Sequence, residues 1–269
     1  MLLFTKYCLT TIVVTFGLVS CNKLEYSPNQ VFDKNTPQNL NSKNLQNLLN
    51  ASDDDTVRFV LSGDTQRSYA NSSDFVNRVN NIQGIDFVLL DGDISDFGLL
   101  QEMEWINQIY SNLHVPYFGV IGNHDLLAKG EDVFRRMYGE LNYSFVYKGI
   151  KFICHNTNSR EVGFNGKVPN IEWLKNELKS QNGIIGYIAV SHVSPFSVDF
   201  DKKLEEGYVF IFKESGNLLA SLHAHDHKTG IYHPYKDLCP FIVTNAIANR
   251  EFLILEIRNG RVEIEVVEY

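Results

Sequence analysis

The chain has less positive than negative charge, and this limits the partners that it can bind. It contains 24 lysines and arginines against 32 aspartates and glutamates, a formal net charge of −8 at pH 7. A protein that tracks nucleic-acid phosphates over a broad surface needs an excess of cations. The composition therefore argues against an extended nucleic-acid surface. It leaves room for a small phosphorylated partner, because a bound metal ion can be the largest local charge in a site.

The hydrophobic run at the N-terminus, Cys8 to Val19, is too short to cross a bilayer, which takes about 20 apolar residues. One cation, Lys6, precedes it, as in an export signal. The following Leu18-Val19-Ser20-Cys21 resembles the lipobox of bacterial lipoproteins, in which cleavage before the cysteine frees that cysteine for a lipid. We expect residues 1–20 to be a signal peptide and Cys21 to anchor the protein in the bacterial cell envelope, periplasmic or surface-exposed. An ordinary secretory signal or a weak anchor helix is the alternative.

Cysteine is scarce, with only 4 in the chain. Cys8 lies in the signal and Cys21 is the lipidation candidate, so Cys154 and Cys239 remain in a compartment that permits disulfides. Both lie in apolar, strand-like sequence, which favours two buried free thiols over a pair. Neither has the context of a zinc ligand.

Residues 21–55 are rich in Asn, Ser, Gln and Asp and poor in apolar side chains. Such a segment buries too little surface to offset the entropy of ordering, so we predict a polar tether. A short helix that docks on the domain is an alternative for its second half, because several leucines share one helical face. These are Leu40, Leu45, Leu48 and Leu49. The remaining residues, 56–269, suffice for one α/β domain.

Five short apolar runs each stop at a residue that can bind a metal. Runs of this kind are typical of buried strands. In sheets built from alternating strands and helices, ligands gather beyond the carboxyl ends of the strands, so the pattern predicts one shared metal site. The residues that follow the runs are Asp64, Asp93, Asn123, His192 and His223.

Alternating strands and helices are predicted from Val57 onward, and strand follows strand after Leu219. The stretch between His192 and Leu218 is predicted to be rich in loops. We expect residues 158–170 and 194–217 to form the rim of the site.

The polar residues after the apolar runs form an ordered set of motifs. They are Gly63-Asp64-Thr65-Gln66, Gly92-Asp93-Ile94-Ser95-Asp96, Gly122-Asn123-His124-Asp125, Ser191-His192 and His223-Ala224-His225. The set resembles that of the calcineurin-like metallophosphoesterases, from about Val57 to the C-terminus. The resemblance implies an α/β fold, a four-layer α/β/β/α sandwich with two facing mixed β-sheets. It also implies a dinuclear centre of two divalent metal ions, for which Mn, Fe and Zn are all suited to these donors.

The resemblance implies a role for each motif residue. Asp64, Gln66 and His225 would hold one metal; Asn123, His192 and His223 would hold the other; Asp93 would bridge them. The expected reaction is hydrolysis of a phosphate mono- or diester by a hydroxide shared between the two ions. His124 would assist the leaving group, and Asp96 would orient His124 by accepting its second ring N–H. Asp125 is expected to be structural.

Two positions depart from the family pattern. Gln66 stands where the family usually has His, and Leu222 stands where it usually has Gly. A neutral amide oxygen is a poorer donor than imidazole for most transition metals, so Gln66 keeps a second reading open: a lipid-anchored phosphate- or metal-binding protein with a degraded, non-catalytic site. His227 continues the run of histidines, but the pattern stops at His225, so a solvent-facing or substrate-rim role is expected for it.

Overall fold

The computed structural model describes residues 31–49 and 56–269. The chain divides into two units, Met1–Val31 and Phe32–Tyr269, and every described helix and strand belongs to the second. The predicted signal peptide, residues 1–20, and Cys21 lie outside the described residues. None of the helices in the two described ranges combines the length and hydrophobicity that a bilayer span requires.

The first sheet has five strands in the order β11-β10-β1-β2-β3. Their bounds are β1 Val57–Ser62, β2 Phe87–Asp91, β3 Tyr117–Val120, β10 Glu251–Arg258 and β11 Arg261–Glu268. β1, β2 and β3 run parallel, whereas β10 pairs antiparallel with both β1 and β11, so the sheet is mixed. The three parallel strands are almost entirely buried, as continuous apolar runs predict.

The second sheet has six strands in the order β4-β5-β6-β7-β9-β8. Their bounds are β4 Tyr143–Tyr147, β5 Ile150–Cys154, β6 Gly186–Val190, β7 Leu218–His223, β8 Gly230–Tyr232 and β9 Phe241–Val243. The four inner strands β5, β6, β7 and β9 are parallel, and the edge strands β4 and β8 are antiparallel to their neighbours. This sheet is therefore mixed as well.

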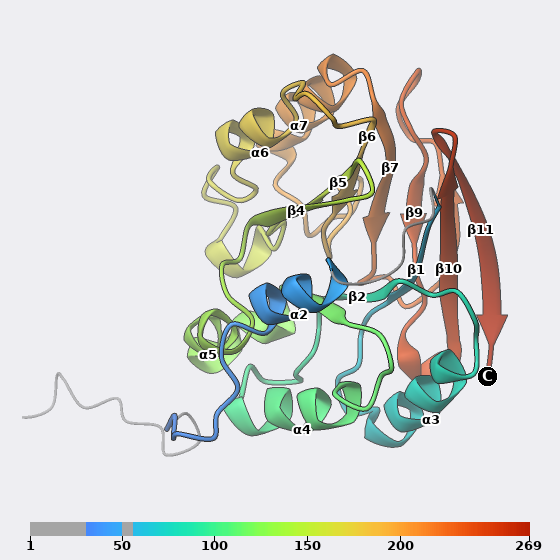
Figure 1. Cartoon of the computed structure of the whole chain (residues 1–269). Coiled ribbons are helices and arrows are strands. Elements are labelled where there is room, and N and C mark those ends of the chain that lie inside the picture. Colours follow the sequence, from blue (N-terminus) through green and yellow to red (C-terminus); the bar gives the residue numbers. More distant parts are fainter. Residues whose placement is uncertain (1–30, 50–55) are drawn as a thin grey trace, which may run out of the picture. The chain divides into compact units, whose positions relative to one another are not determined.

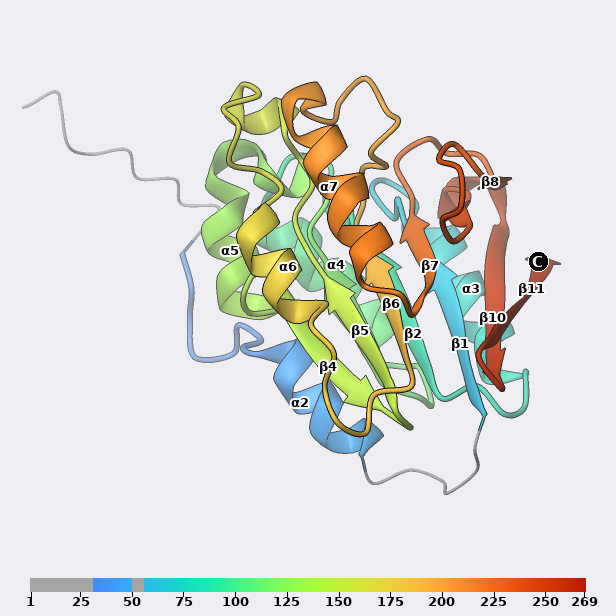
Figure 2. The ribbon, with the colours of Figure 1, turned by 90° about the horizontal axis from the view of Figure 1, so that it is seen from above.

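The two sheets face each other and helices cover both outer faces (Figures 1 and 2). The helices against the first sheet are α3 Tyr69–Asn80, α4 Leu100–Tyr110 and α5 Gly130–Met137; those against the second are α6 Ile171–Glu177 and α7 Lys202–Glu214. Aromatic rings fill the space between the sheets, where Phe59 stacks on Phe87 at 5.1 Å between centroids and Phe152 meets both edge-on. The four-layer α/β/β/α fold is confirmed.

Helix α7 occupies residues that were predicted to be loop, so that prediction is wrong. The Asp201 side chain caps the helix by accepting a hydrogen bond from the backbone N–H of Lys203. Tyr208, Ile211 and Phe212 are buried against the second sheet. Gly207 and the β-favouring run from Tyr208 to Phe212 hide the helical period, and burial of one face overrides their local preference.

The short helix α2, Leu40–Leu48, lies within the segment predicted to be a tether and packs against the edge strand β3. The Asn41 side chain donates to the carbonyl of Gly119 at 3.0 Å and accepts from its N–H at 2.9 Å. Asn44 donates to the carbonyl of Tyr117 at 2.6 Å, and Leu48 is fully buried. The side chains of Asn41 and Asn44 thus form hydrogen bonds with backbone groups at the edge of β3, to which another strand could otherwise pair.

Cys154 and Cys239 are both free thiols. Cys154 is buried between the sheets, and Cys239 is partly buried before β9. Burial raises the pKa of the Cys239 thiol to about 12, and it also raises the pKa of Cys154. Because the thiolate is the reactive form, neither residue is suited to nucleophilic chemistry.

Candidate metal centre

Candidate ligands stand at the same place relative to four strands of the two sheets. Asp64 lies two residues beyond the end of β1, and Asp93 lies two residues beyond β2. His192 and His225 lie two residues beyond β6 and β7. Because the parallel strands of each sheet end on one side, these positions converge at a single edge of the sandwich.

The backbone at several of these positions is held in the left-handed region, which non-glycine residues seldom adopt. The φ angles are 53° at Asp64, 51° at Asp93, 70° at His225 and 52° at His227. Each such residue costs on the order of 1–3 kcal/mol, and residues of this kind cluster at functional sites. Glycine makes the close approach of the loops possible, because a side chain at Gly92 would collide with the His192 ring.

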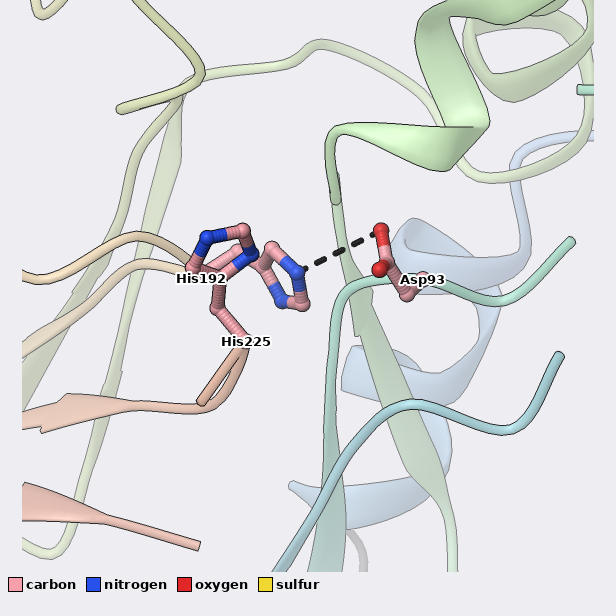
Figure 3. Close-up of side chains that lie close together, drawn as sticks. All are labelled: Asp93, His192 and His225. Atoms are coloured by element: carbon pink, nitrogen blue, oxygen red, sulfur yellow. Dashed lines mark ion pairs between the residues drawn. The ribbon is translucent and has the colours of Figure 1, made fainter. Parts of the chain in front are cut away.

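His192 is fully buried and its ring is oriented by the first sheet. Its Nδ1 donates to the backbone carbonyl of Asp91 at 2.7 Å. Nε2 then faces the carboxylate of Asp93, 3.3 Å away (Figure 3), and that of Asp64, 3.9 Å away. Neither contact has hydrogen-bond geometry, so Nε2 is a buried nitrogen without a hydrogen-bond partner among the described residues. An imidazole nitrogen beside two carboxylates is the donor set of a cation site.

Two groups of side chains bring their ligand atoms within 4.8 Å of one another, and Asp93 belongs to both. One group contains Asp93, His192 and His225, and the other contains Asp64, Asp93 and His227. Asn123 joins the first group, because its Oδ1 lies 3.0 Å from Nδ1 of His225. In the second group, Nε2 of His227 lies 3.0 Å from Oδ1 of Asp64.

His223 does not belong to the centre, and this corrects the placement predicted from the sequence. It is the last residue of β7 and is fully buried. Nδ1 donates to the carbonyl of Ser191 at 2.8 Å, and Nε2 accepts from the Ser221 hydroxyl at 2.9 Å. The ring stacks on Phe241, and burial lowers the pKa of His223 to about 3.

The error was one of register. β7 was expected to end at Leu222, but it continues through His223. Successive strand residues face opposite sides, so His223 points with Ser221 toward the α7 face, while Leu222 points between the sheets. The candidate histidine pair of the centre is therefore His225 and His227, preceded by Ala224 and not by Leu222. His227, for which a solvent-facing or substrate-rim role was expected, is thus a candidate ligand. Asp64, Asp93 and His192 each lie two residues beyond the end of a strand, and the same spacing after β7 identifies His225 as the ligand.

Gln66 lies beside the shared carboxylate. Its Nε2 donates to Oδ2 of Asp93 at 3.3 Å. Its Oε1 is buried and has no hydrogen-bond partner among the described residues. An amide oxygen left without a partner next to Asp93 is a free acceptor for a cation, so the structure keeps Gln66 among the candidate ligands.

His124 opens the 3₁₀ helix η2, His124–Lys129, at the solvent side of the shared carboxylate. Its backbone N–H donates to Oδ1 of Asp93 at 2.9 Å, and its side chain is 36% exposed. Nδ1 donates to the backbone carbonyl of Asp96 at 2.8 Å, whereas the nearer carboxylate oxygen of Asp96 lies 3.7 Å away. Asp96 thus orients His124 through its main chain and not, as predicted, through its carboxylate.

The carboxylate of Asp96 has a different partner. Its Oδ2 accepts from Nε of Arg67 at 2.6 Å, and the guanidinium group of Arg67 lies over the Phe97 ring. Asp125 is structural, as expected: its carboxylate accepts from the backbone N–H groups of Ser95 and Gly122 at 2.8 and 2.9 Å. It thereby ties together the loops that carry Asp93 and Asn123.

The electrostatics of the centre favour positive charge. Burial by itself raises the pKa of Asp93, but the neighbouring His192 outweighs burial and lowers that pKa to about 2. Burial disfavours charged His192, yet the carboxylates, Asp93 first, raise its pKa well above the usual value. Because several carboxylates share a buried space with imidazoles, the residues present fit a divalent metal centre.

A sequence model of the calcineurin-like phosphoesterases matches residues 57–229. The chain belongs to the calcineurin-like phosphoesterase family. The matched range includes all of the candidate ligands, and it ends just after His227. No curated protein matches the sequence.

Solved structures share the fold at low sequence identity. A purple acid phosphatase from yellow lupin (Lupinus luteus) seeds has a TM-score of 0.63 and 14% identity, over 79% of this chain and 51% of that one. This chain therefore spans about half the length of the lupin enzyme. A dimetal phosphatase from Danio rerio also has a TM-score of 0.63 and 14% identity, over 79% and 99%. GAP50, the anchor in the inner membrane complex of Plasmodium, has a TM-score of 0.59 and 15% identity, over 79% and 84%.

Proposed function

We propose that the protein is a metal-dependent phosphoesterase that hydrolyses a phosphate mono- or diester at a dinuclear centre. The observation that carries the proposal is the sharing of Asp93 between two adjacent ligand groups. Asp64, Gln66 and His227 would hold one ion and Asn123, His192 and His225 the other, with Asp93 between them. Mn, Fe and Zn all suit this mixture of oxygen and nitrogen donors.

Two divalent ions in such a site supply a water of lowered pKa for attack on phosphorus and positive charge for the phosphate oxygens. The side chains of the protein position the reacting groups and supply the proton for the leaving oxygen. His124 is held by its Nδ1 on the Asp96 carbonyl, so Nε2 is directed toward the centre and lies 4.0 Å from Oδ2 of Asp93. In its protonated form, His124 donates a proton from Nε2 to the leaving oxygen.

We also propose that a lipid on Cys21 anchors the enzyme to a membrane of the bacterial cell envelope, where it acts on small phosphorylated molecules. The signal-like run and the residues before Cys21 support this proposal. The test is mass spectrometry of the membrane-associated protein. A lipid-modified N-terminal cysteine is expected in the parent and a soluble, unmodified chain in Cys21→Ser; an unmodified parent would contradict the anchor.

The enzymatic proposal is tested by metal counting combined with turnover. Metal-free protein is reloaded with Mn, Fe or Zn and assayed against aryl phosphomonoesters and bis-aryl phosphodiesters. Two ions per chain and hydrolysis of at least one ester class are expected. One ion per chain without hydrolysis would favour the alternative, a lipid-anchored phosphate- or metal-binding protein, for which Gln66 is the motivating feature.

A further inference from the structure

Asp199 lies where the rim meets the centre, in the segment between β6 and α7. One carboxylate oxygen, Oδ2, lies 3.1 Å from Nε2 of His225. The other, Oδ1, accepts from Nη1 of Arg160 at 3.0 Å. The Asp199 side chain is only 18% exposed, whereas that of Arg160 is 65% exposed. Neither residue falls in any of the sequence motifs.

The contact with Asp199 determines which nitrogen of His225 carries the proton. An ionised carboxylate only accepts hydrogen bonds, so Nε2 of His225 must be the protonated nitrogen. A metal ion binds imidazole through the lone pair of one ring nitrogen, so Nδ1 is the nitrogen left for a metal.

That lone pair faces another acceptor. Nδ1 of His225 lies 3.0 Å from Oδ1 of Asn123. In the neutral ring no hydrogen lies between these two acceptor atoms, so they repel each other unless a cation lies beside both. Two donors at about 2.1 Å from one ion, at right angles, are separated by about 3.0 Å. The Asn123–His225 pair therefore has the spacing of neighbouring ligands.

We propose that Asp199 is a positioning residue that fixes His225 in the tautomer able to bind a metal through Nδ1, and that Arg160 holds Asp199 in place. This rests on the proposed dinuclear centre. Two other rings near Asp93 are oriented by backbone carbonyls: His192 by Asp91 and His124 by Asp96. A carboxylate partner makes the ligand nitrogen of His225 more basic than a carbonyl would.

The Arg160–Asp199 ion pair also connects the metal centre to the rim, residues 158–170 and 194–217. Arg160 lies in the 3₁₀ turn η3, Arg160–Val162, and Asp199 lies in the loop before α7. The same two segments meet again where the Gly166 N–H donates to the Asp201 carboxylate at 2.9 Å. Displacement of the rim therefore alters the support of His225 directly.

The test compares Asp199→Ala and Asp199→Asn with the parent. Asp199→Ala removes the acceptor, and we expect the affinity for one of the two ions to fall about 10–100-fold, the usual effect of removing a carboxylate behind a metal-binding histidine. Asp199→Asn keeps an acceptor oxygen and should lose less. Asp74→Asn is the matched control, because Asp74 forms an exposed ion pair with Arg250 at 2.8 Å and no contact with the centre. Zinc or manganese titration with metal counting gives the readout.

A second measurement does not depend on metal. The ¹⁵N spectrum of the His225 ring in the metal-free full chain should show protonated Nε2 in the parent and Asp74→Asn, and mixed tautomers in Asp199→Ala. Parental affinity for both ions in Asp199→Ala, or protonated Nδ1 in the parent, would overturn the positioning role. If the parent binds no metal at all, the proposed function fails, and the tautomer still decides what Asp199 does.

Discussion

The two sheets contribute different chemistry to the same centre. The loops after β1, β2 and β3 supply oxygen atoms, from Asp64, Gln66, Asp93 and Asn123. The loops after β6 and β7 supply imidazole nitrogens, from His192, His225 and His227. Carboxylates bring the negative charge and imidazoles bring borderline-soft donors, and this combination suits Mn, Fe or Zn. Neither sheet by itself forms the site.

Each sheet also orients the other's ligands. His192 follows β6, yet its ring is held by the carbonyl of Asp91 in β2. Asp64 follows β1, yet its Oδ2 accepts from the backbone N–H of His225 at 3.2 Å. Because these hydrogen bonds cross between the sheets, a change on one side is expected to disturb the ligands on the other.

The largest loss of activity is expected from a change in the first sheet, whose loops supply the oxygen ligands. Asp93→Asn removes charge from the residue that both ligand groups share, so turnover should fall by at least about 10²–10³-fold. Metal counting should show fewer than two ions per chain, while far-UV circular dichroism stays unchanged. Parental hydrolysis of an aryl phosphate by this variant would show that Asp93 is not the shared ligand.

The assignment of the imidazole ligands in the second sheet is tested by comparing two histidines at the end of β7 and in the loop after it. His227→Ala should lower metal affinity by more than the about 10–100-fold that is typical for losing a partner behind a ligand. It should leave the free energy of unfolding of the metal-free protein nearly unchanged, because His227 is half-exposed. His223→Ala should destabilise the protein by about 2–4 kcal/mol through a buried cavity and lost hydrogen bonds, with both ions retained. Urea unfolding and metal titration separate the two; the opposite pattern would restore His223 as the ligand.

The pH dependence of stability tests the same assignment. Burial lowers the pKa of His223 to about 3, against about 6.5 in the unfolded chain. Between these values the unfolded state binds a proton that the folded state does not, so stability is lost as the pH falls below about 6.5. From this group the parent should lose about 2 kcal/mol between pH 7.5 and pH 5.

His223→Asn removes that titration while other groups remain. The difference in unfolding free energy between the metal-free parent and His223→Asn should therefore be about 2 kcal/mol smaller at pH 5 than at pH 7.5. Urea unfolding at both pH values gives the measurement. An equal difference at the two values would mean that His223 titrates normally and is not enclosed as described.

The smallest effect is expected when an imidazole replaces one of the oxygen ligands of the first sheet. Gln66→His replaces the amide beside Asp93 with an imidazole, a better donor for transition metals, so the ion held with Asp64 and His227 should bind a few-fold more tightly. Isothermal titration with zinc measures this, with Gln66→Ala as the control. If Gln66→Ala binds both ions as the parent does, Gln66 is not a ligand.

The sequence determined the strand ends and the kinds of ligand, because buried strands and polar turns leave a local signal. Asp64, Asp93, Asn123 and His192 follow apolar runs and lie together in the folded chain. Local pattern could not determine where β7 ends, and a difference of one residue reverses the face of a side chain, so His223 was assigned in place of His227. Helix α7 was missed for a related reason, because its face is recognisable only once the sheet beneath it is known.

Contacts between distant segments were decided by tertiary structure alone. The carboxylate of Asp199 meets His225, and that of Asp96 meets Arg67, across gaps of 26 and 29 residues. No spacing rule relates such partners, because hydrogen bonds between loops depend on how two sheets pack and on which backbone groups remain free. The sequence by itself thus established the family and the chemistry of the donors, and the packing of the sheets chose which histidines face the shared carboxylate.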